Sequence, residues 1–274
     1  MRREMDRCWD VPGVDLSYQF CQSVDDSIVK VTRAVASGVD TILAAGGDGT
    51  ISTAGRVLVG SDVELGAIPA GSGNGFARHF GIPLSPVKAV RALAGAEVRR
   101  IDVGVVNDNP FLVTCSMAWD ASLVKAIEKF PVRGIIPYLF AGVSEYFDYK
   151  PQAVRVTLDS GEELRLPDPL MFTIANLSQY GGGARVAPQA RADDGCLELV
   201  VVLRQDVPGL LGDIPRLFDG TINQIPAVIS RTFRSLTVRR EHAAPIQMDG
   251  ELVDAPVEIE VRVLPGALKV LAPR

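Results

Sequence analysis

The residues best suited to chemistry in this chain are an acid set among glycines, in the stretch Gly46-Gly47-Asp48-Gly49-Thr50. An apolar run from Thr41 to Ala45 precedes this stretch, and a helical pattern follows it. A strand that breaks into a glycine-rich turn before a helix offers backbone N–H groups to an anion. Asp48 can then face a cation or a hydroxyl. The stretch predicts a phosphate-binding turn. The alternative is a plain turn whose glycines serve only backbone geometry.

A second glycine-rich turn, Gly71-Ser72-Gly73-Asn74-Gly75, directly follows the apolar run from Glu64 to Pro69. Neither turn matches the P-loop pattern or the G-x-G-x-x-G dinucleotide pattern. Neither turn carries a lysine, so backbone N–H groups, Mg²⁺ and Arg78 would have to meet the phosphate charge. Since Gly-Ser-Gly also occurs in ordinary loops, the second turn suggests phosphate binding mainly because it follows the first turn on the next strand.

Three further stretches combine glycine with polar residues in the second half of the chain: Tyr180-Gly181-Gly182-Gly183, Asp193-Asp194-Gly195 and Asp249-Gly250-Glu251. Each has a purely structural alternative. Asp-Gly is a favoured hairpin turn, and a run of glycines suits a flexible or bulged loop. Spacing alone does not make Asp249 or Glu251 catalytic.

The elements that must position these turns alternate between helix and strand in residues 23–95. Helices are expected at 23–37, 50–59, 76–80 and 85–94, and strands at 41–45 and 64–69. The first helix has an apolar stripe at Val24, Ile28, Val31 and Val35, with Ser23 as its cap and Gly38 as its stop. Such alternation predicts a parallel sheet with helices on both faces, whose ligands bind at the carboxyl ends of the strands. Residues 1–22 show no clear period and are expected to be irregular.

The sequence pattern changes near residue 98, where short β-like runs replace the alternation of helix and strand. Strands are expected at 103–106, 111–116, 154–158, 171–176, 197–203, 235–239, 257–264 and 268–271, with a partly helical stretch at 120–149. The sequence therefore predicts two domains, an α/β domain over 1–98 and a larger, β-sandwich-like domain over 99–274. The C-terminal tail is expected to return to the first domain.

Composition limits the classes of function. The 274 residues carry a formal net charge of −5, which argues against a broad nucleic-acid surface. Four scattered cysteines and two histidines suggest neither a disulfide framework nor a metal-thiolate site, and free thiols fit a cytoplasmic protein. The uncharged stretch from Gly134 to Ser144 is far shorter than the roughly 20 residues that span a bilayer. Contact with a membrane surface remains open, and Ile135 to Val143 is either a lipid-facing patch or part of the core.

Taken together, these residues resemble the diacylglycerol kinase catalytic-domain family, which includes bacterial lipid kinases and sphingosine kinases. The resemblance rests on a series of motifs in family order: Gly-Gly-Asp-Gly-Thr at 46–50, Ile-Pro-Ala-Gly-Ser-Gly-Asn at 68–74, Ile-Asp-Val-Gly at 101–104, Ala-Asn at 175–176, Tyr-Gly-Gly-Gly at 180–183, Ala-Pro at 187–188, Asp-Gly-Cys-Leu at 194–197 and Asp-Gly-Glu at 249–251. The first motif is shared with NAD kinases, whereas the ordered set is specific to the lipid enzymes.

The resemblance implies ATP as phosphoryl donor, a lipid alcohol as acceptor, and an active site between the two domains. It implies Glu251 as general base, with Asp249 beside it and Asp48 facing both. It also implies a structural Mg²⁺ held by the main chain of Arg191 and Cys196 and by the Asp194 carboxylate. The nucleotide-binding positions that it implies are Gly46, Gly47, Asp48, Gly49, Thr50, Ile51, Ser52, Gly71, Ser72 and Asn74.

The resemblance also implies a cytoplasmic kinase that contacts the membrane surface, and it leaves a homodimer open. Two departures accompany it. The strand and Asn-Pro-x-x-Gly turn that usually open the family are not found, and Ala118-Trp119-Asp120 stands where many relatives have Gly-Phe-Asp. A sphingoid-base kinase, a NAD kinase and a non-catalytic nucleotide- or lipid-binding protein are the alternatives.

Overall fold

The computed structural model describes residues 1–118 and 152–274. The expected partly helical stretch over 120–149, the Ile135–Val143 patch, Trp119 and Asp120 lie outside the described residues. The chain divides into two compact units. The first comprises Met1–Ile101 with Gly266–Arg274, and the second comprises Asp102–Pro265.

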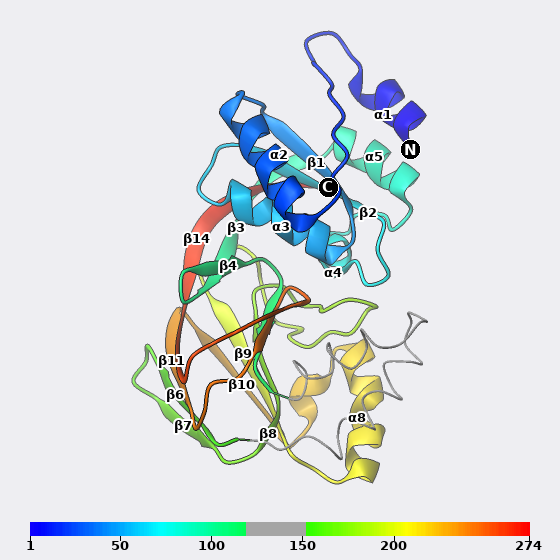
Figure 1. Ribbon diagram of the computed structural model, residues 1–274. Coiled ribbons are helices and arrows are strands. Elements are labelled where there is room, and N and C mark those ends of the chain that lie inside the picture. The colour runs from blue at the N-terminus through cyan, green and yellow to red at the C-terminus, as the bar shows by residue number, and fades with distance from the viewer. Residues whose placement is uncertain (119–151) are drawn as a thin grey trace. The chain divides into compact units, whose positions relative to one another are not determined.

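The first unit alternates helices with parallel strands (Figure 1). Its elements are α1 (Arg2–Trp9), α2 (Val24–Ala36), β1 (Thr41–Gly46), α3 (Asp48–Leu58), β2 (Glu64–Pro69), α4 (Gly75–His79) and α5 (Pro86–Ala94), joined by the first part of β3 (Glu97–Val106) and the last part of β14 (Glu258–Ala272). β2 pairs in parallel with β1 along its whole length and with β14 at Lys269 and Val270. The predicted α/β class of this unit is confirmed.

Local signals placed most of these elements correctly. Ser23 caps α2 as predicted, because its Oγ accepts a hydrogen bond of 3.1 Å from the backbone N–H of Asp26. The helix after the first glycine turn begins at Asp48 rather than Thr50, since extended Gly47 already serves as its N-cap and its carbonyl accepts from Ile51 at 3.1 Å. On the predicted apolar stripe of α2, Val31 is buried whereas Val24 and Ile28 are exposed.

The prediction that residues 1–22 are irregular is wrong for α1. This helix is strongly polar, so its sequence gives little periodic signal, and contacts with α5 hold it instead. Met5 is buried, the Trp9 indole N–H donates to the carbonyl of Val90 at 3.3 Å, and Glu4 pairs with Arg91.

The second unit contains two mainly antiparallel sheets, so its predicted β-rich class is confirmed. One sheet is built from the rest of β3 and β14 with β4 (Asn109–Phe111), β6 (Val154–Leu158), β7 (Glu163–Leu166) and β11 (Ser235–Arg240). The other runs in the order β10 (Val228–Phe233), β9 (Leu197–Leu203), β8 (Pro169–Ala175), β5 (Thr114–Ser116), β12 (Ile246–Met248) and β13 (Glu251–Val253). Helix α8 (Val207–Asp219) and a short 3₁₀ turn (Ile222–Gln224) link β9 to β10.

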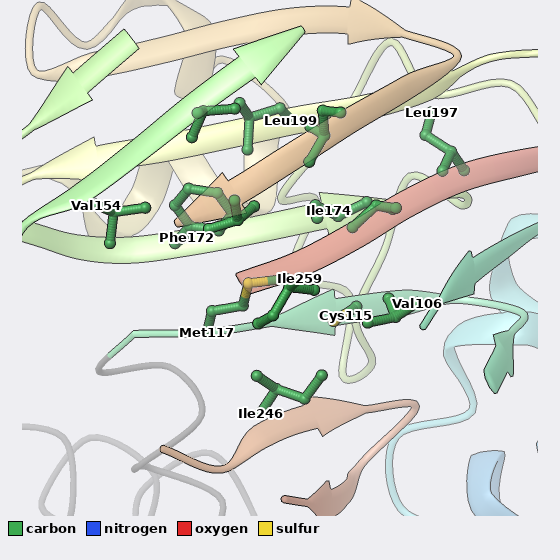
Figure 2. Close-up of a cluster of buried hydrophobic side chains, with 14 of the residues drawn as sticks. Val106, Cys115, Met117, Val154, Phe172, Ile174, Leu197, Leu199, Ile246 and Ile259 are labelled. Atoms are coloured by element: carbon green, nitrogen blue, oxygen red, sulfur yellow. The ribbon is translucent and has the colours of Figure 1, made fainter. Parts of the chain in front are cut away.

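Side chains from both sheets of this unit form one hydrophobic core (Figure 2). Val154 and Ile259 come from the first sheet, and Phe172, Ile174 and Leu199 come from the second. Alternate residues of β6 are buried and exposed, as expected for a strand with one face in a core and the other in solvent.

Two predicted strand boundaries in this unit need correction. The expected run 111–116 is split into β4 and β5, because the N–H groups of Leu112 and Val113 donate to a carboxylate instead of a strand neighbour. The expected strands 257–264 and 268–271 form a single strand, β14, which passes through Pro265 and Gly266 without a break. Among the residues that the structure describes, no helix combines the length and apolar composition needed to cross a bilayer.

Candidate functional site

The two glycine turns meet at the carboxyl ends of β1 and β2, which are neighbours in register from Thr41 opposite Glu64 to Gly46 opposite Pro69. The N–H of Ala70 donates to the carbonyl of Gly46 at 2.8 Å. A Cβ on Gly71 would lie 2.5 Å from the Cα of Gly47, so only glycine allows this approach. The two turns therefore form a single backbone platform at one edge of the sheet.

Asp48 and Asn74 hold this platform together. The Asp48 carboxylate accepts a hydrogen bond of 3.1 Å from the N–H of Phe76, in the first turn of α4. Asn74 is buried in the left-handed region at φ 51°, and its amide both accepts from the N–H of Gly71 at 3.0 Å and donates to the Gly71 carbonyl at 2.7 Å. Both side chains shape the turns directly.

The predicted nucleotide-binding residues differ in what they can offer. Gly49 and Thr50 lie in the first turn of α3, where backbone N–H groups have no partner within the helix and face anions favourably. Ser72 is exposed on the second turn. Ile51 and Ser52 have buried side chains, and the N–H of Ile51 already donates to the Gly47 carbonyl.

In the second unit, Asp249 and Gly250 form the two-residue turn between β12 and β13. Both have positive φ, 51° and 94°, as expected for the favoured Asp-Gly hairpin turn. The buried Asp249 carboxylate accepts three backbone N–H bonds, from Leu112 and Val113 at 2.8 Å each and from Thr114 at 3.1 Å. This carboxylate fixes the hairpin to the β4–β5 connection.

Glu251 follows this turn as the first residue of β13, opposite Met248. Its side chain is half-buried. A half-buried carboxylate that directly follows this turn is held in position and keeps part of its surface exposed. Glu251 is therefore better placed than the buried Asp249 to exchange a proton with a ligand.

The loop on the other side of this hairpin is closed by Arg240, which sequence reasoning did not single out. Its buried Nη2 donates to the carbonyls of Ala244, Ala255 and Pro256 at 2.9, 2.9 and 2.7 Å. Burial lowers the pKa of Arg240. An arginine in the inward register of an alternating strand, Leu236 to Arg240, is the signal that could have identified it.

A second set of buried polar contacts reaches the predicted magnesium residues. The Asn176 amide donates to the carbonyls of Asp102 and Leu112 at 2.8 and 2.9 Å, and the Asp102 carboxylate accepts from the N–H of Gly195 at 2.6 Å. The N–H of Asp102 also donates to the Ala192 carbonyl at 2.6 Å. Asp102 and Asn176 thus brace the turn between Ala192 and Gly195. Each of these two residues stands out in the sequence as a polar residue within an otherwise apolar run.

Arg191, Asp194 and Cys196 lie together on this turn. One oxygen of the Asp194 carboxylate accepts a hydrogen bond of 3.0 Å from the N–H of Cys196, and the other oxygen takes no part in that bond. Arg191 forms an ion pair with Asp193, with 3.6 Å between nitrogen and oxygen. The main-chain carbonyls of Arg191 and Cys196 and the Asp194 carboxylate would supply oxygen donors only, the kind that Mg²⁺ prefers. The residues present therefore fit the ion that the sequence implied.

Comparison with known proteins identifies similar chains over nearly the whole length. Residues 3–106 match the model of the diacylglycerol kinase catalytic domain, and residues 114–272 match that of the YegS C-terminal NAD kinase beta sandwich-like domain. A diacylglycerol kinase of Mycobacterium tuberculosis is 31% identical over 270 residues, covering 96% of this chain and 86% of the relative. A protein of Chromohalobacter salexigens named "Probable lipid kinase YegS-like" is 29% identical over 263 residues, covering 90% and 81%.

Solved structures show the same fold. The crystal structure of a diacylglycerol kinase from Bacillus anthracis is similar with a TM-score of 0.72 and 19% identity, covering 98% of this chain and 88% of that one. A NAD kinase from Archaeoglobus fulgidus in complex with ATP is similar with a TM-score of 0.51 and 16% identity, covering 100% and 89%. At these identities the similarity concerns the fold alone.

Proposed function

The chain belongs to the diacylglycerol kinase catalytic-domain family, and on that premise we propose that it transfers the γ-phosphate of ATP to the hydroxyl of diacylglycerol or a related lipid alcohol. One observation carries the proposal most strongly: two glycine turns abut, backbone to backbone, at the carboxyl ends of neighbouring parallel strands. This is the place where α/β sheets bind nucleotides. The amides of the first turn of α3 would face the phosphates, with Ser72 at the rim.

In phosphoryl transfer the protein mainly positions the reactants and neutralises charge. A lipid hydroxyl is a poor nucleophile at neutral pH, and Glu251 would take its proton as the oxygen attacks phosphorus. Asp249 and Arg240 would keep the Glu251 hairpin fixed. Asp48 is proposed to act beside the phosphates while its Oδ1 remains bonded to α4.

Magnesium has two proposed places in this account. Mg²⁺ bound with ATP would neutralise phosphate charge, and Asp48 is the carboxylate of the first unit proposed to hold it. A second ion would bind Asp194 and the main-chain oxygens of Arg191 and Cys196, where it would stiffen a turn that Asp102 already braces.

The substitution Glu251→Gln tests the reaction. It keeps the size and polarity of the side chain but removes the base, so transfer of label from ATP to diacylglycerol is expected to fall by at least about a hundredfold, the lower range for general-base catalysis. Calorimetric ATP binding should stay within about twofold of wild type. Glu163→Gln, a matched change on the exposed face of β7, should leave both unchanged. Near-normal turnover by Glu251→Gln would refute the assigned base.

The same assay distinguishes the alternative functions. Wild-type protein is given labelled ATP with diacylglycerol, a sphingoid base or NAD in parallel. Preference for the sphingoid base would reassign the acceptor, and phosphorylation of NAD would replace the lipid kinase altogether. ATP binding without transfer to any acceptor would identify a nucleotide-binding protein.

A further inference from the structure

Three arginines occupy the same cross-strand row on the outer face of the second unit's β6–β7–β11 sheet. Arg155 of β6 lies opposite Arg239 of β11 on one side and opposite Arg165 of β7 on the other. All three are exposed, because they alternate with buried core residues along their strands. Figure 1 shows the three strands side by side. We call these three residues the arginine row.

The row concentrates positive charge where strand pairing disfavours it. Directly opposite like charges destabilise a sheet. Some other exposed arginines of the described residues are paired with acids, as Arg231 is with Glu162 at 2.9 Å, whereas Arg33, Arg99 and Arg234 are not. Within the same described part of the chain, none of the three guanidinium groups in the row has a hydrogen bond or ion pair. The row is therefore able to bind an external anion.

The surroundings of the row form an open cavity of about 530 Å³. Its exposed lining includes the row, one acid, Glu241, and Pro167, whereas Val154, Leu166 and Arg240 also border it but are buried. Glu258 lies opposite Arg239 at one end of the row, so the row is flanked but not neutralised. A guanidinium group can donate two parallel hydrogen bonds to the oxygens of one phosphate, so a row of three suits phosphate groups.

We propose that the arginine row docks this protein on membranes by binding the phosphate groups of anionic phospholipids. The inference rests on the proposed function for its choice of a lipid source, since a kinase for diacylglycerol must reach a bilayer. Clustered basic residues are attracted to anionic leaflets by about 1 kcal/mol each. The chain as a whole carries a formal charge of −5, so its net charge would not attract it to an anionic membrane. A local basic patch must provide that attraction.

The test measures co-sedimentation of the full chain with vesicles of phosphatidylcholine, with or without phosphatidylglycerol, in the absence of ATP. The variant Arg155→Gln/Arg165→Gln/Arg239→Gln removes the row. The control Arg33→Gln/Arg99→Gln/Arg234→Gln makes the same charge change at exposed arginines away from it. We expect wild type and control to bind the anionic vesicles, and loss of the row to weaken binding about fivefold per arginine, or about a hundredfold in all.

Three outcomes would overturn the proposal: similar weakening by both triple variants, equal binding to neutral vesicles, and release by inorganic phosphate at an ionic strength where chloride has no effect. The last would indicate a site for a free anion. Folding is checked by thermal melting, and the row variant should melt no lower than the control because it relieves like-charge repulsion. Since no nucleotide is present, vesicle binding reports on the row even if the lipid kinase assay fails.

Discussion

Asp249 can be interpreted either as a structural residue of its turn or as a catalytic residue. Its carboxylate accepts three backbone N–H bonds and is buried, while Glu251 two positions later is half-buried. A carboxylate engaged by three donors is suited to fixing a backbone rather than to exchanging protons with a substrate. We therefore expect Asp249 to act on the reaction through the position of Glu251.

This role predicts a large loss of stability in Asp249→Ala. Removing the carboxylate leaves the buried N–H groups of Leu112, Val113 and Thr114 without their acceptor, and each costs about 1–3 kcal/mol. The free energy of unfolding in urea should fall by about 3–5 kcal/mol once partial relaxation is allowed for. Asp254→Ala, an exposed acid just after β13, is the control and should change it by less than about 0.5 kcal/mol. A stable but inactive Asp249→Ala would favour direct catalysis instead.

Because the two glycine turns are in contact, Gly71→Ala tests the proposed nucleotide-binding platform. The added Cβ would lie 2.5 Å from the Cα of Gly47, so the two turns must separate. Overpacking of this kind costs about 1–3 kcal/mol, and calorimetric ATP affinity should fall with it. Gly95→Ala is the matched control, because its Cβ meets nothing within 4 Å, its φ of −114° is ordinary and it lies outside the two turns. Equal melting temperatures for the two variants would contradict the close approach.

At the scale of elements, one ionised side chain contributes to the docking of α1. The hydrogen bond from Arg91 holds the pKa of Glu4 at about 2, well below its ordinary value. A depressed carboxyl pKa stabilises the docked helix above the ordinary pKa of about 4.3, and this contribution is lost as pH falls toward 2. We expect the fluorescence of Trp9, measured in a Trp119→Phe background, to change over this range.

The variant Glu4→Gln isolates that effect. It cannot ionise, so its Trp9 signal should already be shifted at pH 6 and should respond little to acid. Glu64→Gln, which alters an acid of β2 that bonds Thr41, should keep the wild-type transition. A wild-type acid profile in Glu4→Gln would mean that Trp9 and its bond to Val90, rather than the Glu4–Arg91 pair, hold the helix.

Local signals predicted the elements that have their own periodicity and caps. β2, β6 and β9 lie where alternation or apolar runs placed them, and Ser23 begins α2. Helix α8 was missed, although Asp206 as N-cap, Pro208 in the first turn and Gly220 as stop were readable signals. Helix α1 had no such pattern and depends on packing against α5.

The details of the site depended on contacts distant in sequence. The predicted acids and glycines occur in turns, as expected from Asp-Gly and Gly-rich stretches. That Asp249 binds the backbone 135–137 positions away, or that Arg155 faces two further arginines, follows only from strand register. Register is fixed by the buried faces of whole sheets, so no local window of sequence contains it.

At the scale of the whole molecule, the first unit is discontinuous in sequence. Its sheet takes its third parallel partner from β14, whose Lys269 and Val270 pair with β2 and whose Lys269 also bonds Asp62 at 2.7 Å. Leu268, Val270 and Leu271 are buried. Residues 266–274 are thus part of the core of this unit.

Deleting residues 266–274 is therefore expected to unfold the first unit and abolish ATP binding. Burial of side chains of this size contributes about 1.5–3 kcal/mol each, a large part of the stability of a domain. Limited proteolysis should then cleave within residues 1–101 at rates typical of unfolded chains. The variant Lys269→Gln, which keeps the strand and removes only the bond to Asp62, should remain resistant. Resistance of the deletion variant would show that β1 and β2 suffice.

That discontinuity sets an order of events during synthesis. Residues 1–101 are synthesised long before residue 266. One side of β2 therefore stays unpaired while more than half of the chain is made. The intervening residues, 102–265, form a continuous unit that can fold as they emerge. A chain terminated before residue 266 would therefore be expected to leave the first unit, and with it the proposed nucleotide-binding platform, unstable and open to proteases.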